Sequence, residues 1–217
     1  TLNVEDETMS GEKLLIAAKI VAKAGEQIEQ IIELLNEKLI EVITDDENKI
    51  RADGDWYDKS IDSSGGWMIK TYLWDIARFQ GKSKKPYAHL AVQIMLYDEE
   101  ESRIRGFEPS IYIMYSPGEE EFGEESIRLS CMIEENARLD GDRLWRWKEF
   151  EVDDSWMFAV PLVKMQNEEA LMEQVVEPVK KLLAKEKPFI VFAGDSMAFK
   201  FSFDQEGSLI MIAGNNE

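Results

Sequence analysis

The chain has 217 residues, 44% of them apolar and 10% aromatic, with 44 Asp and Glu against 25 Lys and Arg. This length and composition suffice to bury a hydrophobic core, so we expect one globular domain over residues 1–217 rather than a disordered chain. The formal net charge of −19 argues against direct binding to nucleic acid or to an anionic membrane, because the phosphates of both are negative.

One cysteine, Cys131, and one histidine, His89, limit the chemistry that the chain can support. A single cysteine excludes a disulfide framework within the chain, and the two residues are too few for a Cys/His zinc site. We therefore expect no metal site and no cofactor. No apolar run approaches the roughly 18 residues that would cross a bilayer, and no signal peptide is visible, so we expect a cytoplasmic protein without a membrane span.

Residues 10–44 contain the longest periodic pattern in the chain. Apolar or small residues follow one another at alternating steps of four and three, the spacing of a coiled-coil seam: Leu14, Ala18, Val21, Gly25, Ile28, Ile32, Leu35, Leu39 and Val42. A second apolar row beside this seam gives a face wide enough to pack on a sheet. We predict one long helix laid on a sheet, and a homodimer through helix 10–44 is the alternative.

Residues 45–66 are rich in aspartate, and we interpret them as a polar connector after the first helix. Alternation of apolar and polar residues then predicts strands at 67–76, 87–97, 108–116, 127–133 and 156–162, and a strand or short turn at 144–150. Residues 77–86 form a basic loop. The strands 87–97 and 108–116 flank a charged loop, which predicts an antiparallel hairpin.

A helical period returns at residues 167–186, where Asn167 is a suitable N-cap and Pro178 predicts a kink or a break. The remaining chain predicts three strands, at 189–193, 198–203 and 208–213. The order of elements indicates an α+β fold. Its long N-terminal helix packs on a mainly antiparallel sheet, followed by the second helix and the C-terminal strands.

Candidate catalytic groups are few. A Ser–His–Asp or Cys–His site would have to use His89, which follows Ala88 and precedes Leu90 in a predicted strand and is best explained as structural. Cys131 falls on the regular face of a strand and fits a core position. We therefore favour a non-enzymatic protein. The alternative is a carboxylate-based or cation-dependent enzyme with a site on the sheet or in loop 45–66.

Acidic runs supply the candidate binding residues, because carboxylates on a rigid surface steer and hold Arg/Lys-rich proteins. Trp145 and Trp147 lie beside one such run, and aromatic residues beside charges are typical of interface hot spots as well as of cores. The predicted partner-binding residues are Asp98, Glu99, Glu100, Glu101, Glu119, Glu120, Glu121, Glu124, Glu125, Trp145, Trp147, Asp153 and Asp154.

This arrangement of charge is similar to that of acidic inhibitors, such as toxin immunity proteins and DNA-mimicking antagonists. The charge, the opening helix and the following strands also resemble those of type III secretion chaperones. From these features we expect a non-enzymatic acidic protein that binds a basic protein partner, as an inhibitor, immunity protein, DNA mimic or chaperone.

Overall fold

The computed structural model describes residues 11–45, 47–57, 70–118, 122, 128–129, 137–149 and 152–214, without the side chains of residues 55–57, 149 and 152–154. The chain divides into two compact units, residues 1–37 and 38–217. The single domain expected over residues 1–217 stays a prediction. None of the helices in these described ranges is both long and apolar enough to cross a membrane.

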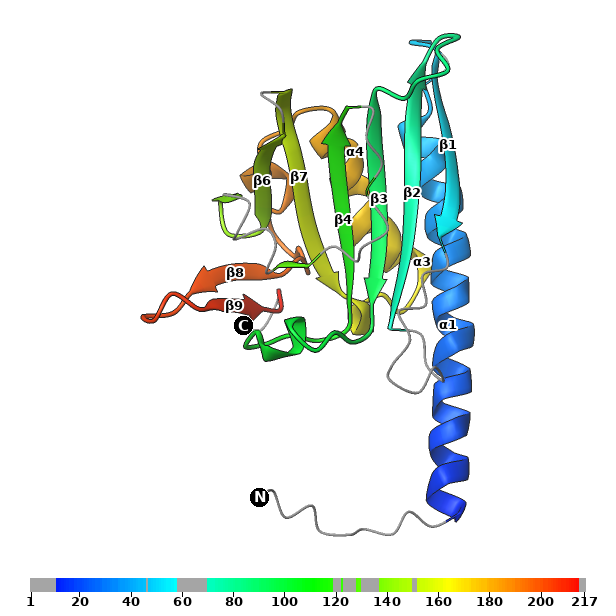
Figure 1. Ribbon diagram of the computed structural model, residues 1–217, viewed down its shortest axis with the longest axis vertical. Coiled ribbons are helices and arrows are strands. Elements are labelled where there is room, and N and C mark those ends of the chain that lie inside the picture. Colours follow the sequence, from blue (N-terminus) through cyan, green and yellow to red (C-terminus); the bar gives the residue numbers. More distant parts are fainter. Residues whose placement is uncertain are drawn as a thin grey trace. The chain divides into compact units, whose positions relative to one another are not determined.

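Helix α1, Gly11–Ile43, is continuous through Gly25 (Figure 1). One long helix was predicted, and it is confirmed although glycine costs about 1 kcal/mol relative to alanine in a helix interior. The end of α1 belongs to the second unit, where Leu39 and Ile43 are fully buried. There Lys38 Nζ lies 3.9 Å from Glu168 Oε1, so this end of the helix lies beside α3.

The second unit is built on a seven-stranded sheet in which every neighbouring pair is antiparallel, in the order β1-β2-β3-β4-β7-β6-β5 (Figure 1). The predicted α+β class and antiparallel sheet are therefore confirmed. The predicted hairpin is β3 paired with β4. The strands are Ile50–Tyr57 (β1), Thr71–Gln80 (β2), Ala88–Met95 (β3), Ser110–Pro117 (β4), Arg138–Asp140 (β5), Leu144–Glu149 (β6) and Val152–Pro161 (β7).

Two predicted boundaries on this sheet are wrong. Strand β1 lies within residues 45–66, which we predicted as a polar connector. It is an edge strand with one neighbour, so charged residues such as the exposed Asp53 point to water and hide the strand pattern. Strand β2 runs four residues into the predicted basic loop, where the guanidinium of Arg78 lies over the ring of Tyr87. The strand predicted at 127–133 lies outside the described residues except for positions 128 and 129.

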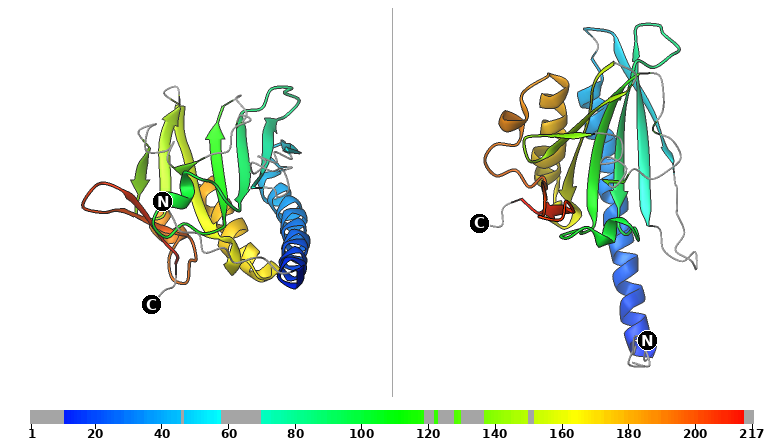
Figure 2. Two further views of the ribbon diagram at one scale, coloured as in Figure 1. Left: turned by 60° about the horizontal axis from the view of Figure 1, so that its bottom comes forward. Right: turned by 60° about the vertical axis from the view of Figure 1, so that its left-hand side comes forward.

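Helices cover one face of the sheet (Figures 1 and 2). They are α3 (Glu168–Leu171), a π-helical turn (Met172–Val176) and α4 (Glu177–Leu183). Among the buried residues on them, Leu171, Val175, Val179 and Leu182 repeat at helical spacing. On the sheet side, the ring of Phe158 in β7 lies 5.3 Å from the ring of Phe192.

The predicted second helix begins where expected, because Asn167 Oδ1 accepts a hydrogen bond from the backbone N–H of Ala170 at 2.8 Å. Pro178 neither breaks nor ends it. The π-helical turn directly precedes α4, and the N–H of Glu177 donates to the carbonyl of Met172. Widened turns of this kind absorb local departures from α-helical hydrogen bonding. The helix ends at Leu183, three residues before the predicted end at 186.

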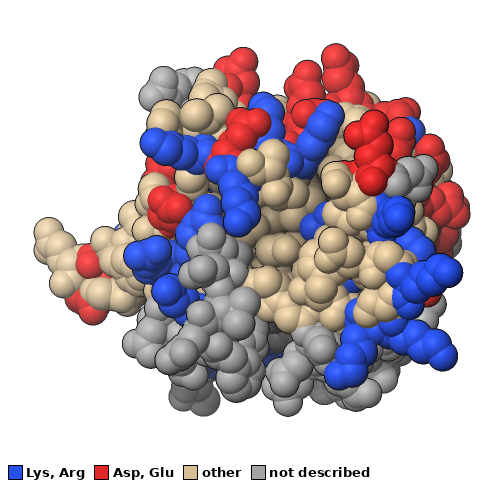
Figure 3. All heavy atoms as spheres, turned by 90° about the horizontal axis from the view of Figure 1, so that it is seen from above, with Lys and Arg blue, Asp and Glu red and all other residues tan. Residues whose placement is uncertain are grey.

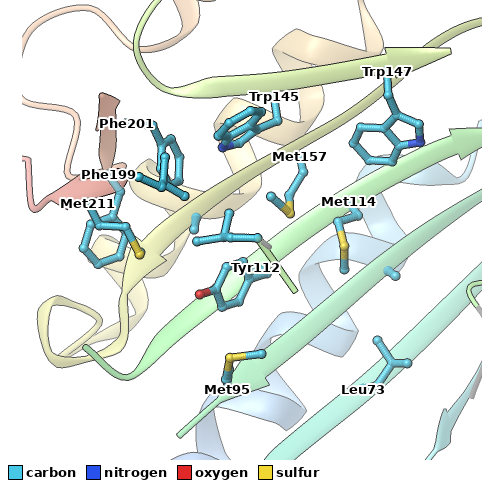
Figure 4. Close-up of a cluster of buried hydrophobic side chains, with 14 residues drawn as sticks. Leu73, Met95, Tyr112, Met114, Trp145, Trp147, Met157, Phe199, Phe201 and Met211 are labelled. Atoms are coloured by element: carbon cyan, nitrogen blue, oxygen red, sulfur yellow. The ribbon is translucent and has the colours of Figure 1, made fainter. Parts of the chain in front are cut away.

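The other face of the sheet carries a cluster of 14 buried hydrophobic residues (Figure 4). The two-stranded sheet of β8 (Lys200–Phe203) and β9 (Leu209–Ile212) covers part of it, placing Phe201 and Met211 in the same cluster as Tyr112 and Trp145. Both C-terminal strands were predicted. The strand predicted at 189–193 is wrong, because residues 188–191 form the short helix α5 (Pro188–Val191). Its proline stands at the first helical position, where a missing N–H has no cost.

Candidate functional site

The topology places two charged loops at opposite ends of the sheet. The basic loop 81–87 precedes β3 and the acidic loop 96–109 follows it, so the eight residues of β3 separate them by about 26 Å. Figure 3 looks onto the end that bears the basic loop and shows groups of Lys and Arg beside Asp and Glu. Lys82, Lys84 and Lys85 are exposed there. The candidates Asp98, Glu99, Glu100 and Glu101 lie at the other end. Asp153 and Asp154 stand at the start of β7, which the register places at the same end as the basic loop.

The acidic loop has a defined backbone. The side chain of Asp98 accepts hydrogen bonds from the backbone N–H groups of Glu100, at 2.8 Å, and Glu101, at 3.1 Å. These bonds fix the start of a short 3₁₀ helix, Glu101–Arg103. Arg128 lies against the loop, with Nη1 2.8 Å from Glu100 Oε2 and Nε 3.4 Å from Asp98 Oδ2. Glu99 and Glu100 are exposed on this loop, and the ion pair with Arg128 restrains the side chain of Glu100.

Glu101 differs from its neighbours because it is fully buried. It faces the phenol of Tyr112, which is also buried. Burial, followed by the negative charges of Glu101 and Asp98, raises the pKa of Tyr112 well above its ordinary value. Glu101 therefore belongs to the interior beneath the loop, and a partner cannot reach it without unfolding this segment.

Of the other predicted binding residues, Trp145 and Trp147 have described side chains, and they do not join this loop. Trp145 and Trp147 are 1% and 8% exposed and belong to the buried cluster, as their core interpretation expected. The ring of Trp145 lies 5.6 Å from the ring of Phe201 (Figure 4). The ring of Phe203 lies 6.3 Å from the ring of Trp145. Asp153 and Asp154 lie on β7, and their side chains are outside the description. The candidates Glu119, Glu120, Glu121, Glu124 and Glu125 lie outside the described residues.

The structure reveals a row of buried polar side chains that the sequence analysis missed. Asp75, His89, Ser116 and Ser155 come from β2, β3, β4 and β7, which are neighbours in the sheet, and each is at most 6% exposed. His89 Nδ1 lies 3.0 and 3.2 Å from the two carboxylate oxygens of Asp75. His89 stands opposite Ser116 in the strand register, and Ser116 Oγ lies 3.3 Å from Ser155 Oγ.

This row, which we call the buried polar row, contains an imidazole that can act as a base and two serine hydroxyl groups. The Asp75 carboxylate orients the imidazole through Nδ1, so Nε2 is left to act on other groups. Within the described part of the chain, His89 Nε2 is buried and has no hydrogen-bond partner. Among the same residues, no three His, Cys, Asp or Glu side chains are grouped to hold a metal ion.

One feature of the sequence could have located this row. Asp75 interrupts the apolar residues of β2, and Ser116 does the same in β4. Burying a polar side chain costs free energy unless it forms a hydrogen bond. A polar residue at a core-facing strand position therefore indicates that a second polar group lies beside it. Which residues meet depends on strand order and register, and the sequence does not give these.

Comparison with known proteins adds nothing to this geometry, because no family model, curated protein or solved structure matches the chain. The function must therefore be argued from the acidic loop and the buried polar row themselves.

Proposed function

We propose that this chain is a non-enzymatic acidic protein that binds a basic protein partner, in the manner of an inhibitor, an immunity protein, a DNA mimic or a chaperone. The observation that carries the proposal is the loop in which Asp98 fixes the backbone and Glu99 and Glu100 face water. The net charge of −19 supports it. The proposal includes a cytoplasmic location.

A fixed acidic loop suits this role physically. Carboxylates that are already held in place lose less conformational entropy on binding than free side chains do. Arg128 restrains Glu100 through an ion pair of 2.8 Å that a partner arginine can share. The net charge of −19 gives the whole molecule a negative field. A basic partner is therefore attracted before it makes contact.

The test is capture of a partner by the immobilised full chain at low salt, followed by elution with a salt step and mass spectrometry. We expect one stoichiometric basic protein that is released at about 0.5 M salt, where the screening length falls to a few ångströms. The charge-reversed variant Glu99→Lys/Glu100→Lys should lose at least tenfold in affinity for the identified protein.

The matched control reverses two charges at the other end of the sheet, as Lys82→Glu/Lys84→Glu, and should bind as tightly as the wild type or tighter. The proposal fails if the wild type captures no basic protein. It also fails if binding survives high salt, or if the two variants bind equally well.

A second candidate function, favoured by the buried polar row, is hydrolysis at a site on the sheet. In this scheme Ser116 Oγ bonds to an acyl carbon while its proton passes to His89 Nε2, and the same proton then leaves on the departing alcohol. In the second half, the oxygen of a water molecule bonds to the acyl carbon while its proton passes to His89 Nε2. The bond from the acyl carbon to Ser116 Oγ then breaks, Oγ takes that proton, and the acid is released. Asp75, 3.0 Å from His89 Nδ1, holds the imidazole in the required orientation.

A fluorophosphonate probe tests this second function, since it bonds to an activated serine. Covalent labelling of Ser116 is expected in the wild type. It should be lost in His89→Gln and kept in Ser155→Ala, with circular dichroism to show that each variant is folded. An unlabelled Ser116 in folded wild-type protein excludes the hydrolase and leaves the proposal of a binding protein unaffected.

A further inference from the structure

Residues 11–25, at the start of α1, expose apolar side chains to water. Each residue from 11 to 24 is exposed, and five large apolar side chains are between 40% and 64% exposed: Leu14, Leu15, Ile16, Ile20 and Val21. The exposed apolar surface ends before Ile28, because Ile28 and Leu35 are only 5% and 0% exposed. Most helical stability comes from burying an apolar face, so residues 11–25 have the properties of a docking surface.

The large apolar residues lie on more than one side of this helix. With successive residues about 100° apart, Leu14 and Val21 share one side, whereas Ile16 and Ile20 lie nearly opposite Leu14. A partner helix packs along one narrow side. A second copy that covered Leu14 and Val21 would therefore leave Ile16 and Ile20 in water. A surface into which the helix sinks covers both sides at once.

Charged residues occupy the remaining narrow side. Glu12, Lys19 and Lys23 lie within about 40° of one another around the helix, and Val21 stands opposite them. Lys13 lies outside this group, but the long stem of a lysine can follow an apolar surface while its charge stays in water. A wide apolar face beside a narrow face with lysines is the pattern of helices that lie in the plane of a lipid interface.

The charges also indicate which kind of bilayer fits. The three lysines of this stretch are outnumbered by Glu12 together with the acids that precede the helix, Glu5, Asp6 and Glu7. The whole chain has a net charge of −19. An anionic bilayer therefore exerts no net attraction on this protein. Burial of apolar surface must drive the binding, and it does so best on a bilayer without net charge.

We propose that residues 11–25 bind the surface of a lipid bilayer without net charge. The helix lies in the plane of the interface, with Leu14 and Val21 deepest and with Lys19 and Lys23 toward water. This stretch is about 22 Å long, shorter than the hydrocarbon core of about 30 Å, so it lies on the bilayer and does not cross it. The inference goes beyond the basic partner proposed above and does not depend on it.

The first experiment measures flotation of the purified full chain with phosphatidylcholine vesicles, whose lipids carry no net charge, at about 0.1 M salt. The wild type is expected to float with the vesicles. The triple variant Leu14→Gln/Ile20→Gln/Val21→Gln should lower the partition coefficient at least tenfold. Glutamine keeps the helix propensity of these positions and removes their apolar surface.

The matched control is Val163→Gln/Phe189→Gln/Ile190→Gln, which changes three apolar side chains of the second unit that are 48–71% exposed. It should bind as the wild type does, and circular dichroism checks that both variants are folded. Wild-type protein that stays unbound overturns the proposal, as does a control that loses as much binding as the triple variant. Binding confined to vesicles that contain phosphatidylglycerol also overturns it, since the attraction would then be electrostatic.

A polarity-sensitive dye tests how the helix lies, in a chain whose single cysteine is replaced as Cys131→Ser. Attached at Leu14→Cys or Val21→Cys, its emission should shift to the blue when vesicles are added. Attached at Lys23→Cys, it should not shift. Equal shifts at all three positions overturn the in-plane orientation. A blue shift at Leu14→Cys without vesicles, with a dimeric mass by light scattering, overturns the proposal and assigns the apolar surface to a second copy.

Discussion

Asp75 and His89 are both almost fully buried, and each is the hydrogen-bonding partner of the other. Burial removes water as an alternative partner, so loss of either side chain leaves the other uncompensated in the interior. The pair therefore stabilises the fold, whether or not the sheet has a catalytic role. Because Asp75 lies on β2 and His89 on the neighbouring β3, we expect its loss to destabilise the whole sheet.

We expect Asp75→Asn to lower the free energy of unfolding by about 2–4 kcal/mol, because the amide replaces a charged acceptor with a weaker one beside the imidazole. The matched control is Asp53→Asn on the neighbouring strand, where the side chain is exposed. It should change stability by no more than about 0.5 kcal/mol. Urea unfolding measures both, and similar losses in the two variants would contradict the importance of the pair.

Tyr112 predicts a sensitivity to alkali. Its phenol titrates near pH 10 when unfolded. In the folded chain burial and the charges of Glu101 and Asp98 raise its pKa. Above pH 10 the unfolded state binds fewer protons than the folded state, so stability that is complete below pH 10 falls as the pH rises. Tyr112→Phe should reduce this fall, as followed by unfolding between pH 9 and pH 11. The exposed Tyr97, replaced as Tyr97→Phe, should leave it unchanged.

At the scale of elements, the attachment of β9 depends on one glycine in the acidic loop. The N–H of Met211 donates to the carbonyl of Arg105 at 2.9 Å, beside Gly106. Gly106 has φ +83°, and a Cβ there would meet the carbonyl oxygen of Met211. The close approach of loop and strand therefore requires glycine for two reasons, its conformation and its lack of a side chain.

Gly106→Ala should cost more than about 3 kcal/mol, because it combines an unfavourable φ with a clash against backbone. Gly81→Ala is the control, since Gly81 has φ +60° with open space at the Cβ position. It should cost about 1 kcal/mol, for conformation alone. Thermal unfolding of the two variants separates these contributions. Equal losses would show that loop and strand can move apart at no cost.

The elements that sequence analysis predicted correctly are those that bury a regular apolar pattern. The long helix, the hairpin of β3 and β4, and the paired strands β8 and β9 all have such a pattern. Strand β1 was missed because an edge strand buries little, and α5 because its four residues are too short to show a helical period. The buried polar row depends on register among four strands, which no local pattern contains.

At the scale of the whole molecule, the net charge of −19 produces repulsion that the fold must overcome. Salt screens repulsion between exposed carboxylates. We therefore expect the melting temperature to rise by several degrees between about 0.05 and about 0.5 M sodium chloride. Differential scanning calorimetry measures this shift, and Glu99→Gln/Glu100→Gln should reduce it. A melting temperature that falls with salt would mean that favourable ion pairs outweigh the repulsion.

The two edges of the seven-stranded sheet affect how the protein behaves at high concentration. Edge strands offer unpaired backbone groups to other chains, and such contacts start β-type aggregation. Here β5 is only three residues long, and it places Arg138 and Asp140 on either side of Leu139. On the opposite edge, β1 carries the exposed charged residues Arg51 and Asp53. The short strand at one edge and the charged residues at both edges therefore disfavour aggregation at high protein concentration.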